Sequence, residues 1–159
     1  MADPQSKDDL LTIKAGILIK KHAFGSGVFG YIPFPIVDAL GIMTVQRKML
    51  SGLAKIYKVP YSQNLAKDLL KTLAGGVAAR ATIPVAMKMI PGIGVLFGST
   101  GMAAIGSAST YAVGKVFQQH FEEGGTLEDF NADQEKENFE AELKAGLKRS
   151  QAKEKKPGQ

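Results

Sequence analysis

Apolar residues recur at helical spacing near the start of the chain and predict a helix over residues 9–22. They fall three and four positions apart, as one face of a helix requires, and they are Leu10, Leu11, Ile13, Ile17 and Leu18. Lys14, Lys20 and Lys21 belong to the same helix. Residues 1–8 are polar, which predicts a flexible N-terminal segment.

An apolar window follows at residues 23–45 and contains two prolines. Asp38 is its only charged residue. Pro33 and Pro35 cannot donate a backbone hydrogen bond, and each disfavours helix in the residue before it. We therefore expect two short arms joined by a break. Asp38 then lies early in the second helix, near its positive dipole end.

The next two helices have distinct apolar faces. The first is expected to end near residues 57–60. Its predicted apolar face is Val45, Met49, Leu53 and Ile56, opposite a polar face of Gln46, Arg47, Lys48, Ser51 and Lys55. Ser62 is a candidate N-cap for the second, whose apolar positions are Leu65, Leu69, Leu70 and Leu73. Gly75 and Gly76 are expected to loosen this helix without ending it.

A second apolar window spans residues 89–114 and contains no charged residue. As a helix rising about 1.5 Å per residue, it could cross a bilayer core of about 30 Å. Pro91 and Gly92 predict a break near its start. Beyond it, small residues recur every four positions, interrupted at Met102, and predict a helix-packing stripe of Gly94, Gly98, Gly106, Thr110 and Gly114. Such a stripe suits close helix packing in lipid and equally in a soluble bundle, so both interpretations stay open.

The C-terminal part of the chain is polar and highly charged. A thin apolar stripe predicts a surface helix from about residue 132, and it consists of Phe130, Phe139, Leu143 and Leu147. The predicted organisation is a flexible segment at 1–8, a glycine-rich apolar helical domain at 9–121, a polar amphipathic helix at 122–148 and a disordered basic tail at 149–159.

An Ile-Pro break between two helices occurs twice, at Pro33 and at Pro91. This recurrence is suggestive of repeated helical hairpins. The predicted fold class is all-α: a small helical bundle of two Pro-broken helical hairpins plus a C-terminal amphipathic helix. Lys and Arg on both sides of the first window favour a re-entrant hairpin with cytoplasmic ends. The second window could form a similar hairpin or a true span.

Composition narrows the classes of function. The formal net charge is +5, from 20 Lys and Arg against 15 Asp and Glu. Because basic residues lie beside apolar segments, lipid is favoured over nucleic acid. The lack of cysteine excludes disulfides, thiolate zinc sites and a cysteine nucleophile. Acidic residues at the start do not fit a cleavable secretory signal.

No catalytic or cofactor pattern is complete. The glycine-rich run at residues 92–98 does not have the spacing of the dinucleotide fingerprint, and no phosphate loop or nucleophile elbow occurs. His22 and His120 lie far apart in sequence, and neither belongs to a helical metal-ligand pair. We therefore predict no enzyme, no cofactor and no metal site.

The acidic segment at residues 129–140 places oxygens at several positions of a calcium-binding EF-hand loop. Gln134, however, stands where that loop needs glycine, and Lys136 stands where it needs an apolar residue. A helix start capped by Asn131 or Asp133 is the preferred interpretation. The lysine-rich end lacks interleaved aromatic residues, so nucleic acid is not a predicted partner.

Several runs together carry a family resemblance. They are IPFPIVD at 32–38, LAKIYKVP at 53–60, IPGIG at 90–94, TYAVGK at 110–115 and EGG at 123–125, with Gln46, Met49 and Phe121 between them. This combination resembles the bacterial family called domain of unknown function 697, over about residues 15–139. Lys58 departs from it, since the family often has glycine after the tyrosine, and this weakens the helix end expected there.

The resemblance implies an all-helical, membrane-associated protein, often joined to or encoded with a small GTPase, and it carries no established catalytic residues. We therefore expect a helical protein at the cytoplasmic face of a bacterial inner membrane, as a partner or membrane anchor for a small GTPase. The alternative is a soluble helical protein-interaction domain with no membrane insertion. Candidate partners are membrane lipid, a small GTPase and a second copy in a homo-oligomer.

Overall fold

The computed structural model describes residues 4–29, 35–80 and 99–154, and over these ranges the secondary structure is helical, with no strand. The helices are α1 (Pro4–Phe29), α2 (Pro35–Tyr57), α3 (Gln63–Arg80), α4 (Ser99–Glu122) and α5 (Lys136–Glu154). The all-α prediction is confirmed.

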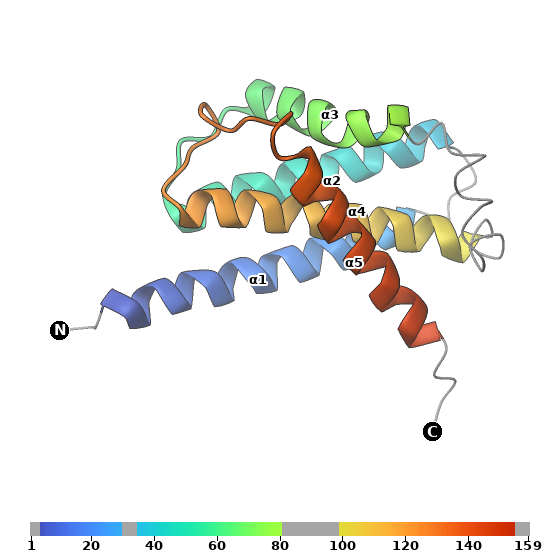
Figure 1. The fold of residues 1–159 in the computed structure, drawn as a ribbon, viewed down its shortest axis with the longest axis horizontal. Helices are drawn as coiled ribbons and strands as arrows, with labels where there is room; N and C mark the ends of the chain where they lie inside the picture. The colour runs from blue at the N-terminus through green and yellow to red at the C-terminus, as the bar shows by residue number, and fades with distance from the viewer. Residues whose placement is uncertain (1–3, 30–34, 81–98, 155–159) are drawn as a thin grey trace.

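The helix α4 lies at the centre of the bundle. It contacts each of the other four helices, and its most extensive contact is with α1. In Figure 1, α1 and α3 lie on opposite sides of α4 and α5 crosses the bundle obliquely, while α2 packs against α1 as well as against α3 and α4. The N-terminal end of α1 extends past the end of the bundle (Figure 1).

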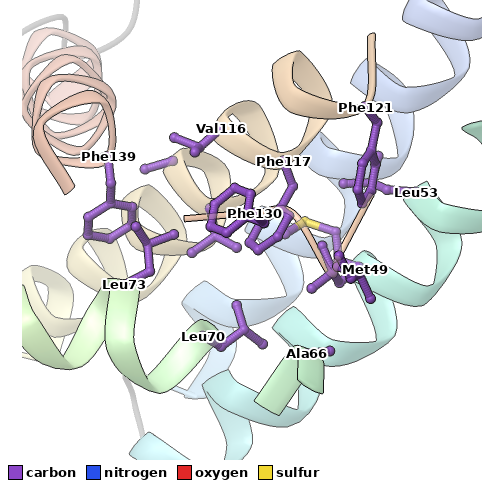
Figure 2. Packing of buried hydrophobic residues seen from close by; sticks show 14 of the residues in the cluster. Met49, Leu53, Ala66, Leu70, Leu73, Val116, Phe117, Phe121, Phe130 and Phe139 are labelled. Atoms are coloured by element: carbon purple, nitrogen blue, oxygen red, sulfur yellow. The ribbon is translucent and has the colours of Figure 1, made fainter. Parts of the chain in front are cut away.

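The hydrophobic core forms where these helices meet. Figure 2 shows side chains from α2, α3, α4 and α5 gathered around two aromatic residues, Phe117 and Phe130. Phe117 of α4 stacks on Phe130 of the loop before α5, with ring centroids 4.0 Å apart. Phe139 brings the start of α5 onto the same cluster. Burial of these large rings holds the C-terminal segment on the bundle.

Two helices end in the same left-handed turn. At the end of α4, Gly124 adopts φ +88°, Gly124 N–H donates to Phe121 O and Gly125 N–H donates to His120 O. At the end of α2, Lys58 adopts φ 58° and Val59 N–H donates to Ala54 O at 2.8 Å. Both are Schellman-type ends. The expected end of α2 is therefore present, although it uses lysine where glycine is favoured.

Side-chain caps start two of the helical segments. Ser62 Oγ accepts from Leu65 N–H at 3.5 Å, ahead of α3. Asn131 Oδ1 accepts from the N–H groups of Asp133 and Gln134 at 3.1 and 3.2 Å. The predicted N-cap role of Ser62 is confirmed, whereas Asn131 caps the turn at residues 132–135 that precedes α5.

The helix limits differ from the sequence prediction at both ends of the chain. The helix α1 already begins at Pro4, although residues 1–8 were predicted to be flexible. The segment after Glu122 forms turns to residue 135, and regular helix begins only at Lys136. The helix α5 then continues to Glu154, since residues 149–154 contain no glycine or proline to end it.

Gln46 was placed on the polar face of its helix, and this prediction is wrong. Its side chain is buried and its Nε2 donates to Ser109 Oγ and Thr110 Oγ1, each at 3.4 Å. The physical reason is that α2 packs against α1, α3 and α4, so more than one of its faces is covered.

Candidate functional site

A row of large apolar side chains lies exposed along the outer face of α1. Leu10 is 51% exposed, Ile13 57%, Ile17 64% and Phe24 79%. Offsets of three, seven and fourteen residues return to nearly the same side of a helix, so the four lie along one face over about 20 Å. We call this set the outer stripe. Four such residues on one helix face differ from the scattered exposure usual on soluble surfaces.

The opposite face of α1 holds the helix on the bundle. Ala15, Ile19 and Ala23 are buried there at four-residue spacing. A Cβ added at Gly114 of α4 would lie 2.7 Å from Ile19 Cγ1, so glycine is what allows these helices to approach. A Cβ at Gly52 of α2 would lie 2.7 Å from Leu18 Cδ2. The helix α1 therefore has two apolar faces, and the bundle covers only one of them.

Three lysines lie beside the outer stripe. Lys14, Lys20 and Lys21 are exposed, and residues 10–29 contain no Asp or Glu. Within the described part of the chain, none of the three forms an ion pair. The outer face of α1 is thus apolar along its middle and positively charged along its edges.

A polar cluster joins three helices behind this face. Glu122 Oε1 at the end of α4 accepts from Thr12 Oγ1 of α1 at 2.7 Å, Tyr57 OH of α2 at 2.8 Å and Gln118 Nε2 at 2.9 Å. Lys115 Nζ donates to Gln118 Oε1 at 3.1 Å. We call Thr12, Tyr57, Gln118 and Glu122 the Glu122 cluster. It fixes the N-terminal half of α1 to the C-terminal ends of α2 and α4.

Electrostatics within the cluster favour a charged Glu122 and a neutral Tyr57. Burial opposes the charge on Glu122, but hydrogen bonds from Thr12, Gln118 and Tyr57, with the nearby charge of Lys115, together lower the pKa of this carboxyl. Burial, and then the hydrogen bond and charge of Glu122, raise the pKa of the Tyr57 hydroxyl. Tyr57 therefore remains a hydrogen-bond donor across the neutral range.

His120 organises the loop after α4. Its Nε2 lies 2.9 Å from Thr126 O and 3.0 Å from Asp129 Oδ1. Asp129 Oδ1 also accepts from Thr126 N–H at 2.6 Å, and this backbone bond, followed by that with His120, lowers the pKa of Asp129. The two hydrogen-bond neighbours of His120 are a backbone carbonyl and an exposed carboxylate. His120 therefore has a structural role at the end of α4. His22 Nδ1 similarly meets Leu18 O, at 2.9 Å.

A shallow pocket of about 310 Å³ lies between α4 and α5. Its lining is mostly polar and consists of Lys115, Val116, Gln119, Glu122, Asn138, Ala141 and Glu142. None of these is a serine, threonine, cysteine, histidine or tyrosine, and Glu122 already accepts three hydrogen bonds in the Glu122 cluster. Over the described ranges, no group of three His, Cys, Asp or Glu side chains could hold a metal ion.

The residues predicted from sequence for helix packing and hairpin breaks are described only in part. Gly106 and Thr110 are buried in α4 and Gly114 faces Ile19 of α1. Pro35 is the first residue of α2. The others lie outside the described residues: Gly94, Gly98, Pro33, Pro91 and Gly92.

Sequence reasoning missed the Glu122 cluster and the outward orientation of the outer stripe. Thr12 and Glu122 are 110 positions apart, and no local spacing links them. Only Gln118 and Glu122, four residues apart on one helix, carried a local signal.

Comparison with known proteins agrees with the sequence motifs. The family model described as domain of unknown function 697 matches residues 11–149. The chain belongs to this family. It is also 30% identical, over 133 residues, to "Magnetosome membrane protein 22" of Magnetospirillum gryphiswaldense, an alignment that covers 81% of this chain and 68% of the relative. No solved structure matches the chain significantly.

Among the described residues, no helix is both long enough and apolar enough to span a membrane. Residues 81–98, which hold the start of the second apolar window, lie outside the described residues.

Proposed function

We propose that this protein is a membrane-associated helical module that docks on a membrane surface through the outer stripe of α1. The observation that carries the proposal is the exposure of Leu10, Ile13, Ile17 and Phe24 on one face of a helix whose other face is buried in the bundle. The name of the magnetosome relative supports a membrane setting.

The outer stripe offers enough apolar surface for reversible binding. Fully burying one such side chain contributes about 1.5–3 kcal/mol. Since the four side chains are between half and four-fifths exposed, their transfer into the interface contributes roughly 4–7 kcal/mol before the cost of immobilisation. This is the range of a surface-bound helix and far below the effectively irreversible insertion of a spanning one.

The finer parts of the proposal concern the two apolar windows and the partner. Entry of residues 23–45 and 89–114 into the bilayer as hairpins would require the bundle to open, because Ala23, Thr110 and Ala112 are buried in it, and it would place the charged C-terminal segment on the cytoplasmic side. A small GTPase is the protein partner proposed from the family resemblance. A pull-down with the full chain in detergent, with GDP and with a non-hydrolysable GTP analogue, tests it: recovery of no GTPase in either state would remove this partner.

Membrane docking is tested by flotation of the full chain with lipid vesicles. We expect the unmodified chain to float and the variant Ile13→Gln/Ile17→Gln to remain largely in the lower fractions. The variant Ile13→Val/Ile17→Val is the matched control, because it keeps an apolar stripe, and we expect it to float. Thermal unfolding of all three checks that the fold persists, since both positions are exposed.

Two outcomes would contradict the proposal. If the unmodified chain does not float with vesicles of any composition, the stripe does not dock on lipid. If the glutamine variant floats as well as the unmodified chain, another surface makes the contact. Loss of a dimer in the glutamine variant, without any change in flotation, would instead assign the stripe to contact between copies.

A further inference from the structure

We propose that the outer face of α1 selects membranes with anionic headgroups, through Lys14, Lys20 and Lys21. This inference rests on the proposed function, because it names the lipid class that the same face binds. The three lysines are exposed, whereas the outer stripe between them is apolar. A helix of this kind lies in the plane of the interface, with its apolar side chains in the acyl boundary and its basic ones at the headgroups.

The lysines lie on both edges of the outer stripe. Lys14 and Lys21 follow Leu10 and Ile17 by four residues, which places them on one edge. Lys20 follows Ile17 by three residues, which places it on the other edge. In a helix lying on a bilayer, lysines at both edges extend their apolar stems along the stripe and raise their ammonium groups to the headgroup level.

From Leu10 onward, the positive charge on this face is uncompensated. Residues 10–29 contain no acidic residue, and within the described ranges no carboxylate pairs with Lys14, Lys20 or Lys21. Lysines already paired within the bundle would have to give up those partners on binding, whereas these three do not. Charge complementarity therefore favours an anionic surface over a neutral one.

The same lysines argue against a second copy of α1 as the occupant. The stripe follows a heptad pattern, with Leu10, Ile17 and Phe24 at a positions and Ile13 at the first d position. The second d position is Lys20. A paired helix would bury this ammonium group in the seam, where a lysine costs stability. A lipid headgroup layer accepts it without burial.

Vesicle binding by the full chain tests the lipid class. The probes are phosphatidylcholine vesicles and vesicles in which a third of the lipid is phosphatidylglycerol. Each lysine near an anionic surface strengthens binding by about fivefold, so three give a preference of about a hundredfold for the anionic vesicles. We expect this preference to shrink in high salt, because the Debye length falls from about 10 Å at 0.1 M to about 3 Å at 1 M.

Charge removal at this face is compared with equal removal elsewhere. The variant Lys20→Gln/Lys21→Gln should bind anionic vesicles about 25-fold more weakly and neutral vesicles unchanged. The matched control is Lys67→Gln/Lys71→Gln, which removes two exposed lysines from α3, on the other side of α4 from α1 (Figure 1). We expect the control to keep most of the preference.

The outcomes separate this inference from the proposed function. Equal binding of the unmodified chain to both kinds of vesicle would overturn the anionic preference and leave docking by the outer stripe intact. Equal losses in the α1 and α3 variants would overturn the assignment to this face, because overall charge would then explain the preference. Binding to neither kind of vesicle would overturn the proposed function itself.

Discussion

Lys58 holds a backbone conformation that disfavours every residue with a Cβ atom. Its φ of 58° lies in the left-handed region, and it closes α2 by allowing Val59 N–H to reach Ala54 O. A left-handed conformation costs a side-chain-bearing residue about 1–2 kcal/mol. Glycine lacks this cost but loses more backbone entropy on folding, by about 0.5–1 kcal/mol.

The difference predicts that Lys58→Gly stabilises the protein by about 0.5–1 kcal/mol. The measurement is the free energy of unfolding in urea, with an unchanged m-value. Lys55→Gly is the matched control, because Lys55 is an exposed lysine within the last turn of α2. There glycine should destabilise by about 1 kcal/mol. A loss of stability in both variants would mean that the left-handed turn does not form.

Gly114, at the α1–α4 contact, and Gly16, beside open space on α1, are expected to respond oppositely to alanine. A Cβ at Gly114 would meet Ile19 Cγ1 and Cγ2 at 2.7 and 2.8 Å, whereas a Cβ at Gly16 would meet nothing within 4 Å. Ile19 is fully buried, and its β-branched side chain has little freedom to move aside. Gly114→Ala should destabilise by about 1–2 kcal/mol, and Gly16→Ala should stabilise by about 0.5–1 kcal/mol.

Thermal or urea unfolding of the two alanine variants measures both signs. Adding Ile19→Ala to Gly114→Ala should cost less than the two single losses added together, since alanine lacks the Cγ1 and Cγ2 atoms that the new methyl group meets. Strictly additive losses would place the cause away from the α1–α4 contact.

At the scale of elements, the Glu122 cluster makes the attachment of α1 depend on pH. The folded pKa of Glu122 lies below its ordinary value, despite burial, because three donors bind its carboxylate. A lowered folded pKa means that this stabilisation is present above the ordinary pKa of a glutamate. It is lost as the pH falls through the lowered folded value.

Glu122→Gln should therefore cost about 1 kcal/mol at pH 7, because the carboxylate is partly exposed and its gain is screened. The variant should also lose less stability than the unmodified chain between pH 7 and pH 3. Tyr57→Phe removes one donor, so its cost should be larger at pH 7 than at pH 3. Urea unfolding at both pH values measures these differences. Parallel pH profiles for all three proteins would contradict the electrostatic role.

The helices could be predicted from sequence better than their orientation. Apolar spacing, the proline positions and Ser62 predicted α1, α2 and α3, because these signals are local. In α1, the spacing of Leu10, Ile13 and Ile17 predicted a helix but not which face packs. Ala15 and Ala23 mark the packed face, yet small alanines give a weak hydrophobic signal. The contact depends on the glycine opposite Ile19, which is remote in sequence.

The candidate site was less predictable than the fold because its parts come from distant segments. The lysines and apolar residues of α1 were visible in sequence, but their exposure depends on where α4 and α2 lie. The Glu122 cluster joins Thr12, Tyr57 and Gln118 through one carboxylate. A periodic pattern within one segment does not indicate which distant segments come into contact. The meeting of these three helices is set only by the packing of the whole bundle.

At the scale of the whole molecule, the bundle holds α1 in place ahead of the proposed docking. One face of α1 is fixed by Ile19 against Gly114 and by Thr12 against Glu122, so the outer stripe is already arranged before a membrane is met. Binding then requires little ordering of the chain, which reduces its entropic cost. We expect the helical content measured by circular dichroism to stay the same when the full chain binds vesicles.

The lack of tryptophan in the chain allows a single reporter of this orientation. Phe24 is the most exposed residue of the outer stripe, and tryptophan favours the membrane interface. Phe24→Trp should therefore bind anionic vesicles at least as well as the unmodified chain, with its fluorescence shifted to shorter wavelength. Thr72→Trp, at an exposed position of α3, is the control, and its fluorescence should show no shift. A shift at Thr72 but not at Phe24 would mean that the bundle meets the membrane through α3, since one docked edge leaves the other in water.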